Sequence, residues 1–214
     1  MRRIGRALAL PMAFLLLGAS ALGAQRGVQI DVAVPAGPGA GAVVTATNLF
    51  ADGDMRELVR SGFPAQLHYR LELWRKGGLF DDLESHQDWD FVIQYDPSAQ
   101  RYLAYRRQGG KIEDLGTFAT LSTARSLLER PTKSTLIPEQ ESARYYYTLA
   151  LDLEALSVSD MDQLERWLRG VRGGGAASAL GSGMRTLMLR MLGGEKRHYD
   201  GKSVSFIPAN LVAP

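Results

Sequence analysis

Three segments of this chain largely alternate apolar and polar residues, over residues 66–73, 88–95 and 144–153. Successive side chains of a β-strand point to opposite sides, so each segment predicts a strand with one apolar and one polar face. Such a strand packs one face against a core and leaves the other in water, which is typical of antiparallel sheets. The alternation therefore favours an antiparallel β-rich domain over a buried parallel sheet.

Turn and strand signals extend this prediction. Asp96-Pro97-Ser98-Ala99 has the composition of a turn, so the strand ending at Tyr95 should form a hairpin with residues 101–107. Residues 28–34 and 43–50 are further strand candidates near the start of the domain.

Short helices are predicted over residues 54–60, 123–130 and about 159–169, each with apolar residues on one face. Gly62 and Pro131 are stop signals for the first two, and Ser159 with Asp162 resembles a capping box for the third. We therefore expect a mainly β, α+β fold: an antiparallel β-sandwich-like domain with a few short covering helices.

The first 24 residues have the layout of a secretory signal peptide. A basic start with three arginines precedes an apolar run over residues 7–17, and small residues follow to Ala24. The run of 11 residues is shorter than the roughly 20 apolar residues that span a bilayer. We expect cleavage near Ala21 or Ala24 and export to the periplasm or cell envelope.

Charge and cysteine content exclude several classes of function. The formal charge of +2 falls to −1 once the three arginines of the leader are removed, so the exported protein is a poor candidate for nucleic-acid binding. The chain has no cysteine, and therefore no disulfide, no cysteine-linked lipid and no thiolate metal site. Packing alone must hold the domain together.

The composition changes at Gly170. Residues 170–214 are rich in glycine, and residues 165–202 hold eight Lys or Arg against three acidic residues. We assign residues 25–169 to the β-rich domain and residues 170–214 to a Gly-rich basic appendage. The appendage is a candidate for peripheral contact with an anionic membrane or a partner, or for docking on the chain's own acidic stretch.

The order of several short motifs resembles a known family. Ser61-Gly62-Phe63-Pro64 leads into the strand ending at Trp74-Arg75, and Tyr95-Asp96 leads through a turn to Arg101-Tyr102. Phe118-Ala119-Thr120-Leu121 opens a helix, and Leu151-Asp152-Leu153 closes a late strand. Over roughly residues 28–157 this order resembles the exported bacterial domain of unknown function 4390 family. The resemblance implies an envelope location and a mostly β domain, and it carries over no catalytic residue.

The acidic stretch over residues 81–90 is the densest group of candidate ligands. If it is extended, five residues would share one face: Asp82, Glu84, His86, Asp88 and Asp90. Oxygen ligands with one imidazole suit a hard divalent ion. Same-face neighbours of one strand lie about 6–7 Å apart, so one ion would not contact all five. We favour the alternative, a solvated hairpin connection that keeps a sheet edge unpaired.

Two aromatic residues fall on the polar faces of their predicted strands. Trp74 and Tyr146 are therefore candidate contact residues, whereas Trp89, Tyr145 and Tyr147 occupy core-facing positions. His68 is also predicted on a polar face, and we expect it to be a surface residue.

No cofactor is expected. Gly37-Pro38-Gly39-Ala40-Gly41-Ala42 has the spelling of a dinucleotide loop, but strand-like Val43–Thr47 follows where that loop needs a helix. Gly201-Lys202-Ser203 lacks the earlier glycine of a P-loop.

The leading hypothesis is a non-enzymatic module that binds an envelope protein or surface component through strand edges and through Trp74 and Tyr146. The first alternative is a hydrolytic or carbohydrate-active envelope enzyme with Asp88 and Asp90 in acid and base roles. The second is a divalent-ion-binding module that uses the acidic stretch.

Overall fold

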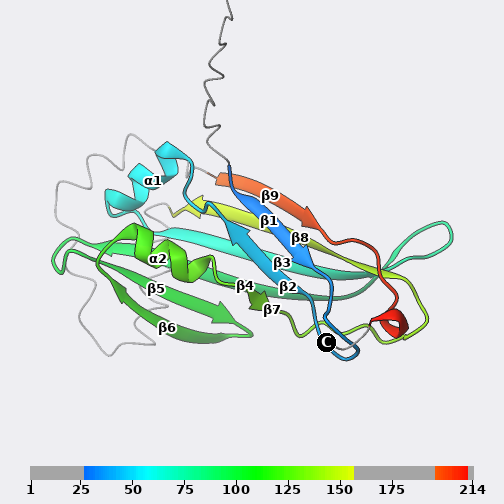
Figure 1. Cartoon of the computed structure of the whole chain (residues 1–214). Coiled ribbons are helices and arrows are strands. Elements are labelled where there is room, and N and C mark those ends of the chain that lie inside the picture. The colour runs from blue at the N-terminus through cyan, green and yellow to red at the C-terminus, as the bar shows by residue number, and fades with distance from the viewer. Residues whose placement is uncertain (1–26, 157–195, 212–214) are drawn as a thin grey trace, which may run out of the picture.

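In residues 27–156 and 196–211, the part of the chain that the computed structural model describes, the strands form two antiparallel sheets (Figure 1). The larger contains, in spatial order, β6 (Lys111–Phe118), β5 (Arg101–Gln108), β4 (Asp82–Asp96), β3 (Ala65–Arg75), β8 (Tyr145–Ala155) and β9 (Lys196–Lys202). The smaller contains β1 (Gln29–Ala33), β2 (Val43–Thr47) and β7 (Thr132–Lys133). Together they make a β-sandwich-like α+β domain, as the sequence predicted.

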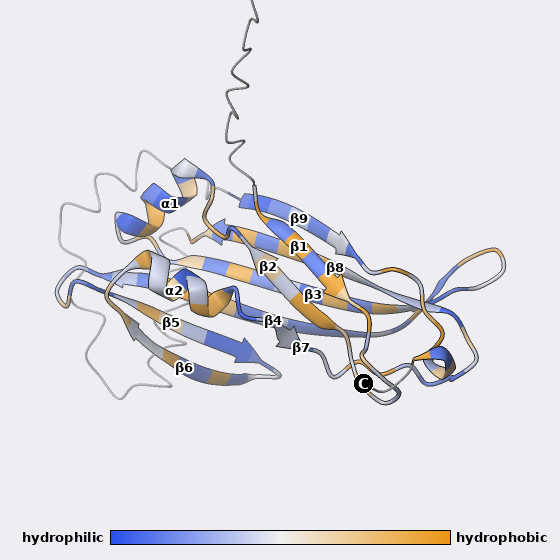
Figure 2. Cartoon of the chain, in the orientation of Figure 1, coloured by the Kyte–Doolittle hydropathy of each residue, from blue (hydrophilic) through white to orange (hydrophobic). Residues whose placement is uncertain are grey.

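The core lies between the small sheet and one face of the large sheet, which we call the inner face. The alternating apolar residues of the three long strands point there and are buried: Leu67, Tyr69, Leu71 and Leu73; Trp89, Phe91 and Ile93; Tyr145, Tyr147, Leu149, Leu151 and Leu153. Val32, Val44 and Ala46 of the small sheet join the same cluster. Figure 2 shows hydrophobic and hydrophilic residues alternating along these strands. The predicted strands and their sidedness are confirmed.

Two helices cover the remaining part of the core, close to the predicted ranges. They are α1 (Gly53–Arg60) and α2 (Leu121–Leu128), and a short 3₁₀ helix, η2, covers Pro208–Asn210. Asp52 caps α1 by accepting hydrogen bonds from the backbone N–H groups of Asp54 and Met55. Thr120 caps α2 in the same way through the N–H of Thr123. Each helix buries one apolar stripe against the core.

The assignment of residues 196–211 to an appendage is wrong. Residues 196–202 form β9, which pairs with β8 and completes the large sheet. Phe206 exchanges two backbone hydrogen bonds with Tyr145 and stacks on the ring of Tyr147 at 5.6 Å. The sequence conceals β9 because the positions that face inward in this strand include Arg197 and Gly201, so it has no apolar alternation.

The sequence also conceals β6. The ladder between β5 and β6 shifts register between Ala104 and Tyr105, and Gly116 adopts a positive φ of 106° beside the shift. A bulge of this kind interrupts the alternation from which a strand is predicted.

Three predicted features lie outside the described residues: the leader over residues 1–24, the helix over 159–169 and the Gly-rich stretch from 170 to 195. Within the described ranges, no helix has the length and apolar composition needed to cross a membrane.

One glycine lets the two sheets approach each other. A Cβ atom at Gly201 of β9 would overlap Cγ2 of Ile30 in β1. We predict that Gly201→Ala lowers the free energy of unfolding by about 1–3 kcal/mol, since overpacking forces the neighbours apart. The measurement is urea unfolding of the variant, alone and combined with Ile30→Ala.

Removing the Ile30 side chain should abolish most of the added cost of the alanine. The matched control is Gly78→Ala, where a Cβ would meet open space and should change stability by less than about 0.5 kcal/mol. If Gly201→Ala lowered the free energy of unfolding equally with Ile30 and with Ile30→Ala, the proposed contact would be contradicted.

Candidate functional site

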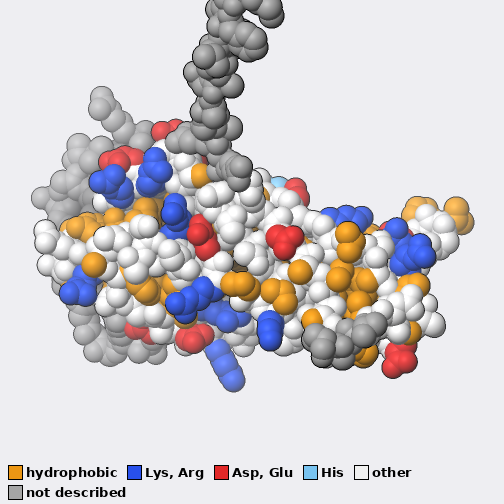
Figure 3. All heavy atoms as spheres, viewed as in Figure 1, with side chains coloured by type: hydrophobic (Ala, Val, Ile, Leu, Met, Phe, Trp, Pro, Cys, Tyr) orange, Lys and Arg blue, Asp and Glu red, His pale blue; other side chains and the backbone are white. Residues whose placement is uncertain are grey.

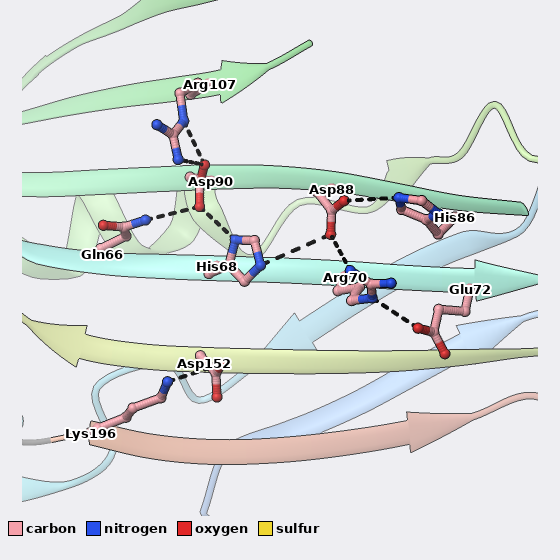
Figure 4. Close-up of polar contacts among 10 residues, drawn as sticks. All are labelled: Gln66, His68, Arg70, Glu72, His86, Asp88, Asp90, Arg107, Asp152 and Lys196. Carbon is pink, nitrogen blue, oxygen red and sulfur yellow. Dashed lines mark hydrogen bonds and ion pairs between the residues drawn. The ribbon is translucent and has the colours of Figure 1, made fainter. Parts of the chain in front are cut away.

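The outer face of the large sheet, opposite the core, carries a row of ionisable side chains across five strands. Arg107, Asp90, His68, Asp152 and His198 are direct cross-strand neighbours on β5, β4, β3, β8 and β9. Directly opposite residues share one face of a sheet. We call these five residues the charged row; Figure 4 shows four of them. Basic and acidic types alternate along it.

Asp90 is the best-connected member of the charged row. Arg107 donates to Asp90 Oδ2 from Nε at 2.7 Å, and its Nη2 lies 2.6 Å from the same oxygen. Asp90 Oδ1 accepts from His68 Nδ1 at 2.7 Å and from Gln66 Nε2 at 3.0 Å. Its side chain is only 6 % exposed. Both carboxylate oxygens are therefore occupied by donors from β3 and β5.

These contacts hold Asp90 in its ionised form. Burial by itself disfavours the charge, but the hydrogen bonds from His68, Gln66 and Arg107 together lower the pKa of Asp90 below its ordinary value. A carboxyl group that serves as a general acid near neutral pH needs a raised pKa. The environment of Asp90 lowers its pKa instead, which opposes a role as a general acid.

A shallow hollow of about 320 Å³ lies over this part of the sheet. Its described lining consists of His68, Arg70, Asp88, Asp90, Arg107, Gln108, Gly109 and Gly110. Asp90 orients the imidazole of His68, whose Nε2 lies 3.9 Å from Asp88 Oδ1. An oriented histidine is part of many hydrolytic sites, where it activates a nucleophile. None of the described lining residues is a serine, threonine or cysteine.

His198 of β9 is the last member of the charged row. His198 Nδ1 donates to Asp152 Oδ1 at 2.6 Å, and Nε2 lies 2.9 Å from Asp200 Oδ1. The hydrogen bond to Asp152, supported by the charge of Asp200, raises the pKa of His198. Lys196 Nζ lies 3.3 Å from the other oxygen of Asp152.

The structure divides the five predicted metal ligands between two faces. The ladder between β3 and β4 shifts at Glu84: Leu83 lies opposite Trp74, whereas Ser85 lies opposite Leu73. This bulge turns Asp82 and Glu84 to the inner side, where Glu84 Oε2 accepts a hydrogen bond from the buried Tyr145.

His86, Asp88 and Asp90 alone remain on the outer face, and both oxygens of Asp90 are already bound by donors. The prediction of one shared face is therefore wrong. Residues 82–90 are also strand rather than a hairpin connection, which covers only residues 76–81. No group of three or more His, Asp or Glu side chains in the described parts of the chain is arranged to hold a metal ion.

Trp74 and Tyr146 come together as direct cross-strand neighbours with parallel rings, whose centroids are 6.5 Å apart. Lys202 Nζ lies 3.8 Å above the ring of Tyr146, which is buried. Trp74 Nε1 lies within hydrogen-bond distance of Glu72 and Thr148. The pair is therefore held in a polar network of its own sheet.

The aromatic pair supports a projecting hairpin. Tyr146 donates its hydroxyl hydrogen to Asp81 Oδ2 at 2.8 Å, and Asp81 Oδ1 accepts from the N–H of Gly77 at 3.2 Å. A Cβ at Gly77 would overlap the carbonyl oxygen of Phe80, so glycine is required for this tight loop. Beyond this anchor Leu79 and Phe80 are 94 % and 84 % exposed.

Three more exposed hydrophobic residues lie at the same end of the domain. Leu83 is the second residue of β4. Ile137 follows Leu136, whose carbonyl oxygen accepts from the Tyr147 hydroxyl, and Val204 follows Ser203, whose hydroxyl oxygen accepts from the Tyr147 N–H. We call Leu79, Phe80, Leu83, Ile137 and Val204 the apolar end. They include every exposed large hydrophobic side chain of residues 27–156 and 196–211. Figure 3 shows hydrophobic side chains at the tip of the hairpin and beside it.

The sequence did contain a signal for the hairpin tip. Two adjacent apolar residues follow Gly77-Gly78 in a connection between two predicted strands, where polar residues are the norm.

Comparisons with known proteins give no relative. No family model matches the chain, and neither the curated proteins nor the solved structures give a match. The resemblance to the domain of unknown function 4390 family stays a prediction.

We predict that Asp90→Asn destabilises the protein at pH 7 by about 1–3 kcal/mol, because Arg107 and His68 lose a buried carboxylate partner. Since the pKa of Asp90 is lowered on folding, its stabilisation is complete above the unfolded value of about 4 and is lost as pH falls through the folded value. The difference between wild type and variant in urea unfolding should therefore shrink between about pH 4 and 2. Asp31→Asn, at an exposed position on β1, is the control; a pH-independent difference at position 90 would contradict this account.

For His198 the sign is reversed. Its pKa is raised on folding, so its stabilisation is present below the unfolded value of about 6.5 and is lost as pH rises through the folded value. We predict an NMR titration midpoint for His198 above about 6.5, and a lower midpoint in Asp152→Asn. An unchanged midpoint in that variant would show that Asp152 is not the cause.

Proposed function

We propose that this protein is an exported binding module of the bacterial cell envelope, which docks a partner protein through the apolar end. The carrying observation is the pair Leu79 and Phe80, almost fully exposed at the tip of an anchored hairpin. Exposed apolar groups that gather in one place are typical of interaction sites.

The anchor makes the tip suitable for binding. Asp81 joins the loop backbone at Gly77 to the hydroxyl of Tyr146, and the N–H of Lys76 donates to the carbonyl oxygen of Arg144 at 2.8 Å. A loop already held in shape loses less conformational entropy when it binds. In this proposal Trp74 and Tyr146 hold the contact loop, and Leu79 and Phe80 make the contact.

The charges near the tip favour a protein over an anionic membrane. Arg75 pairs with Asp82 at 3.2 Å, and the positive charges of Lys76 and Lys202 both help to lower the pKa of Asp81. Membrane-docking apolar loops combine with an excess of basic residues, whereas protein interfaces place apolar anchors inside a mixed polar rim. The apolar end has such a mixed rim and therefore resembles a protein interface.

The membrane alternative for the basic tail loses part of its support. Lys196 is paired with Asp152, Arg197 donates to Asp52 at 3.1 Å, and Lys202 lies over Tyr146. Peripheral membrane contact through residues 170–214 stays a prediction.

The enzymatic alternative has weaker support than binding. Asp90 has a lowered pKa and both oxygens occupied, which opposes an acid role, and the hollow beside it has no nucleophilic side chain among its described lining residues. Export, the other part of the proposal, is supported by the layout of residues 1–24.

We predict that Leu79→Ser with Phe80→Ser weakens partner binding and changes the unfolding free energy by less than about 0.5 kcal/mol, because both side chains are exposed. The measurement is quantitative affinity capture from an envelope fraction, followed by titration of the purified partner. Binding should weaken at least about tenfold, since exposed aromatic anchors often dominate an interface.

The matched control tests the other contact surface that the sequence suggested, an open strand edge. Lys111→Ser with Glu113→Ser alters the exposed side chains of edge strand β6 and should leave binding intact. A partner lost by the β6 variant and kept by the hairpin variant would overturn the assignment to the apolar end. The absence of any partner that depends on Leu79 and Phe80 would overturn the proposed function.

A further inference from the structure

A second cavity lies at the opposite end of β4 from the apolar end. It has a volume of about 510 Å³ and is lined by residues of α1, α2 and the β4–β5 turn. Figure 1 shows α1 and α2 on the side of the domain away from the β3–β4 hairpin. Three arginines line it: Arg56 and Arg60 from α1 and Arg125 from α2. We call this cavity the arginine pocket. Its described lining contains no aspartate or glutamate.

The positive charge of the arginine pocket is poorly compensated. Arg56 and Arg60 are one helical turn apart, a spacing at which like charges repel, and neither makes an ion pair or side-chain hydrogen bond with a described residue. Arg125 Nε forms an ion pair with Glu129 Oε1 at 3.6 Å, but this distance is too long for a hydrogen bond. The buried Nε has no hydrogen-bond partner among the described residues. Glu129 Oε1 instead accepts from the N–H of Leu49 at 2.9 Å.

The first turn of α2 adds donors to the same cavity. Leu121 and Ser122 both line it and follow the cap residue Thr120. The first N–H groups of a helix have no acceptor within the helix, and the helix dipole makes this end positive. Thr120 satisfies the N–H of Thr123, and the backbone carbonyl of Thr120 accepts from Ala124. The N–H groups of Leu121 and Ser122 have no acceptor among the described residues, so both can donate to a ligand.

Aromatic rings form the remaining wall. Tyr95 and Tyr102 contact each other with centroids 4.9 Å apart, and Phe50 lines the cavity with them. Burial raises the pKa of Tyr102, so its hydroxyl stays protonated at neutral pH. The cavity therefore combines cationic and N–H donors with a flat apolar surface.

We infer that the arginine pocket binds a phosphate group carried on a ligand with an aromatic or apolar body. A phosphate monoester has about two negative charges and three acceptor oxygens, which match several guanidinium groups and a helix N-terminus better than one carboxylate does. The ring wall would pack against the body of the ligand. A soluble organic phosphate and a phospholipid headgroup share this chemistry.

This site is independent of the proposed partner docking. Its lining residues come from the helices and the β4–β5 turn, and none belongs to the apolar end. Failure of phosphate binding would leave the docking proposal intact, and the reverse also holds.

The test is isothermal titration of the full chain with phenyl phosphate, whose ring and phosphate represent the two parts of the ligand. We expect saturable binding that weakens with salt and that weakens about tenfold or more in Arg56→Gln, Arg60→Gln and Arg125→Gln. Arg56 and Arg60 are exposed, so these two variants should keep the wild-type unfolding curve. Arg130→Gln, an exposed arginine just after α2 and outside the pocket, should bind like wild type.

A second arm identifies the source of the phosphate. Co-sedimentation with phosphatidic acid vesicles, compared with phosphatidylcholine vesicles, reports a lipid headgroup, whereas binding of phenyl phosphate alone indicates a soluble ligand. Binding to phosphatidic acid vesicles or to phenyl phosphate supports the site if Arg56→Gln and Arg60→Gln weaken that binding. No saturable binding in either arm, or equal weakening by Arg130→Gln, would overturn it.

Discussion

The domain depends on the burial of one face of three neighbouring strands, β3, β4 and β8. Most of their inner positions are filled by leucine, isoleucine and aromatic side chains that are almost fully buried. Complete burial of one such side chain contributes roughly 1.5–3 kcal/mol, and the chain has no disulfide to add to this. Every other feature is attached to this central unit: the small sheet covers its inner face, and the charged row crosses its outer face.

The strict sidedness of these strands also explains why polar contacts gather where they do. Only the outer face was free to carry charge, so Asp90, His68 and Arg107 meet there without disturbing the core. The bulge at Glu84 is the exception, because it lets one strand send acidic residues to both faces. Glu84 then contacts Tyr145 and the N–H of Glu139 at the margin of the core.

The sequence was sufficient to predict the central strands, the β4–β5 hairpin and both described helices, because a period of two or 3.6 residues directly encodes which side is buried. It was insufficient for β9, since a strand at the margin of the core tolerates Arg197 and Gly201 on its inner side. It was also insufficient for the faces of Asp82 and Glu84, because a shift of one residue in register leaves no mark in composition. The arginine pocket unites residues from two helices far apart in the chain, and only the folded structure places them around one cavity.

The position of β9 has a consequence for how the protein is made. Leu156 follows the end of β8 and Lys196 begins the neighbouring strand, although 39 residues separate them in the chain. The large sheet is therefore incomplete until residues 196–202 are present, and until then one edge of β8 lacks its partner. Phe206 arrives later still, to stack on Tyr147. A chain shortened near residue 170 would thus lack β9 and leave one edge of β8 unpaired, so residues 196–206 complete the sheet.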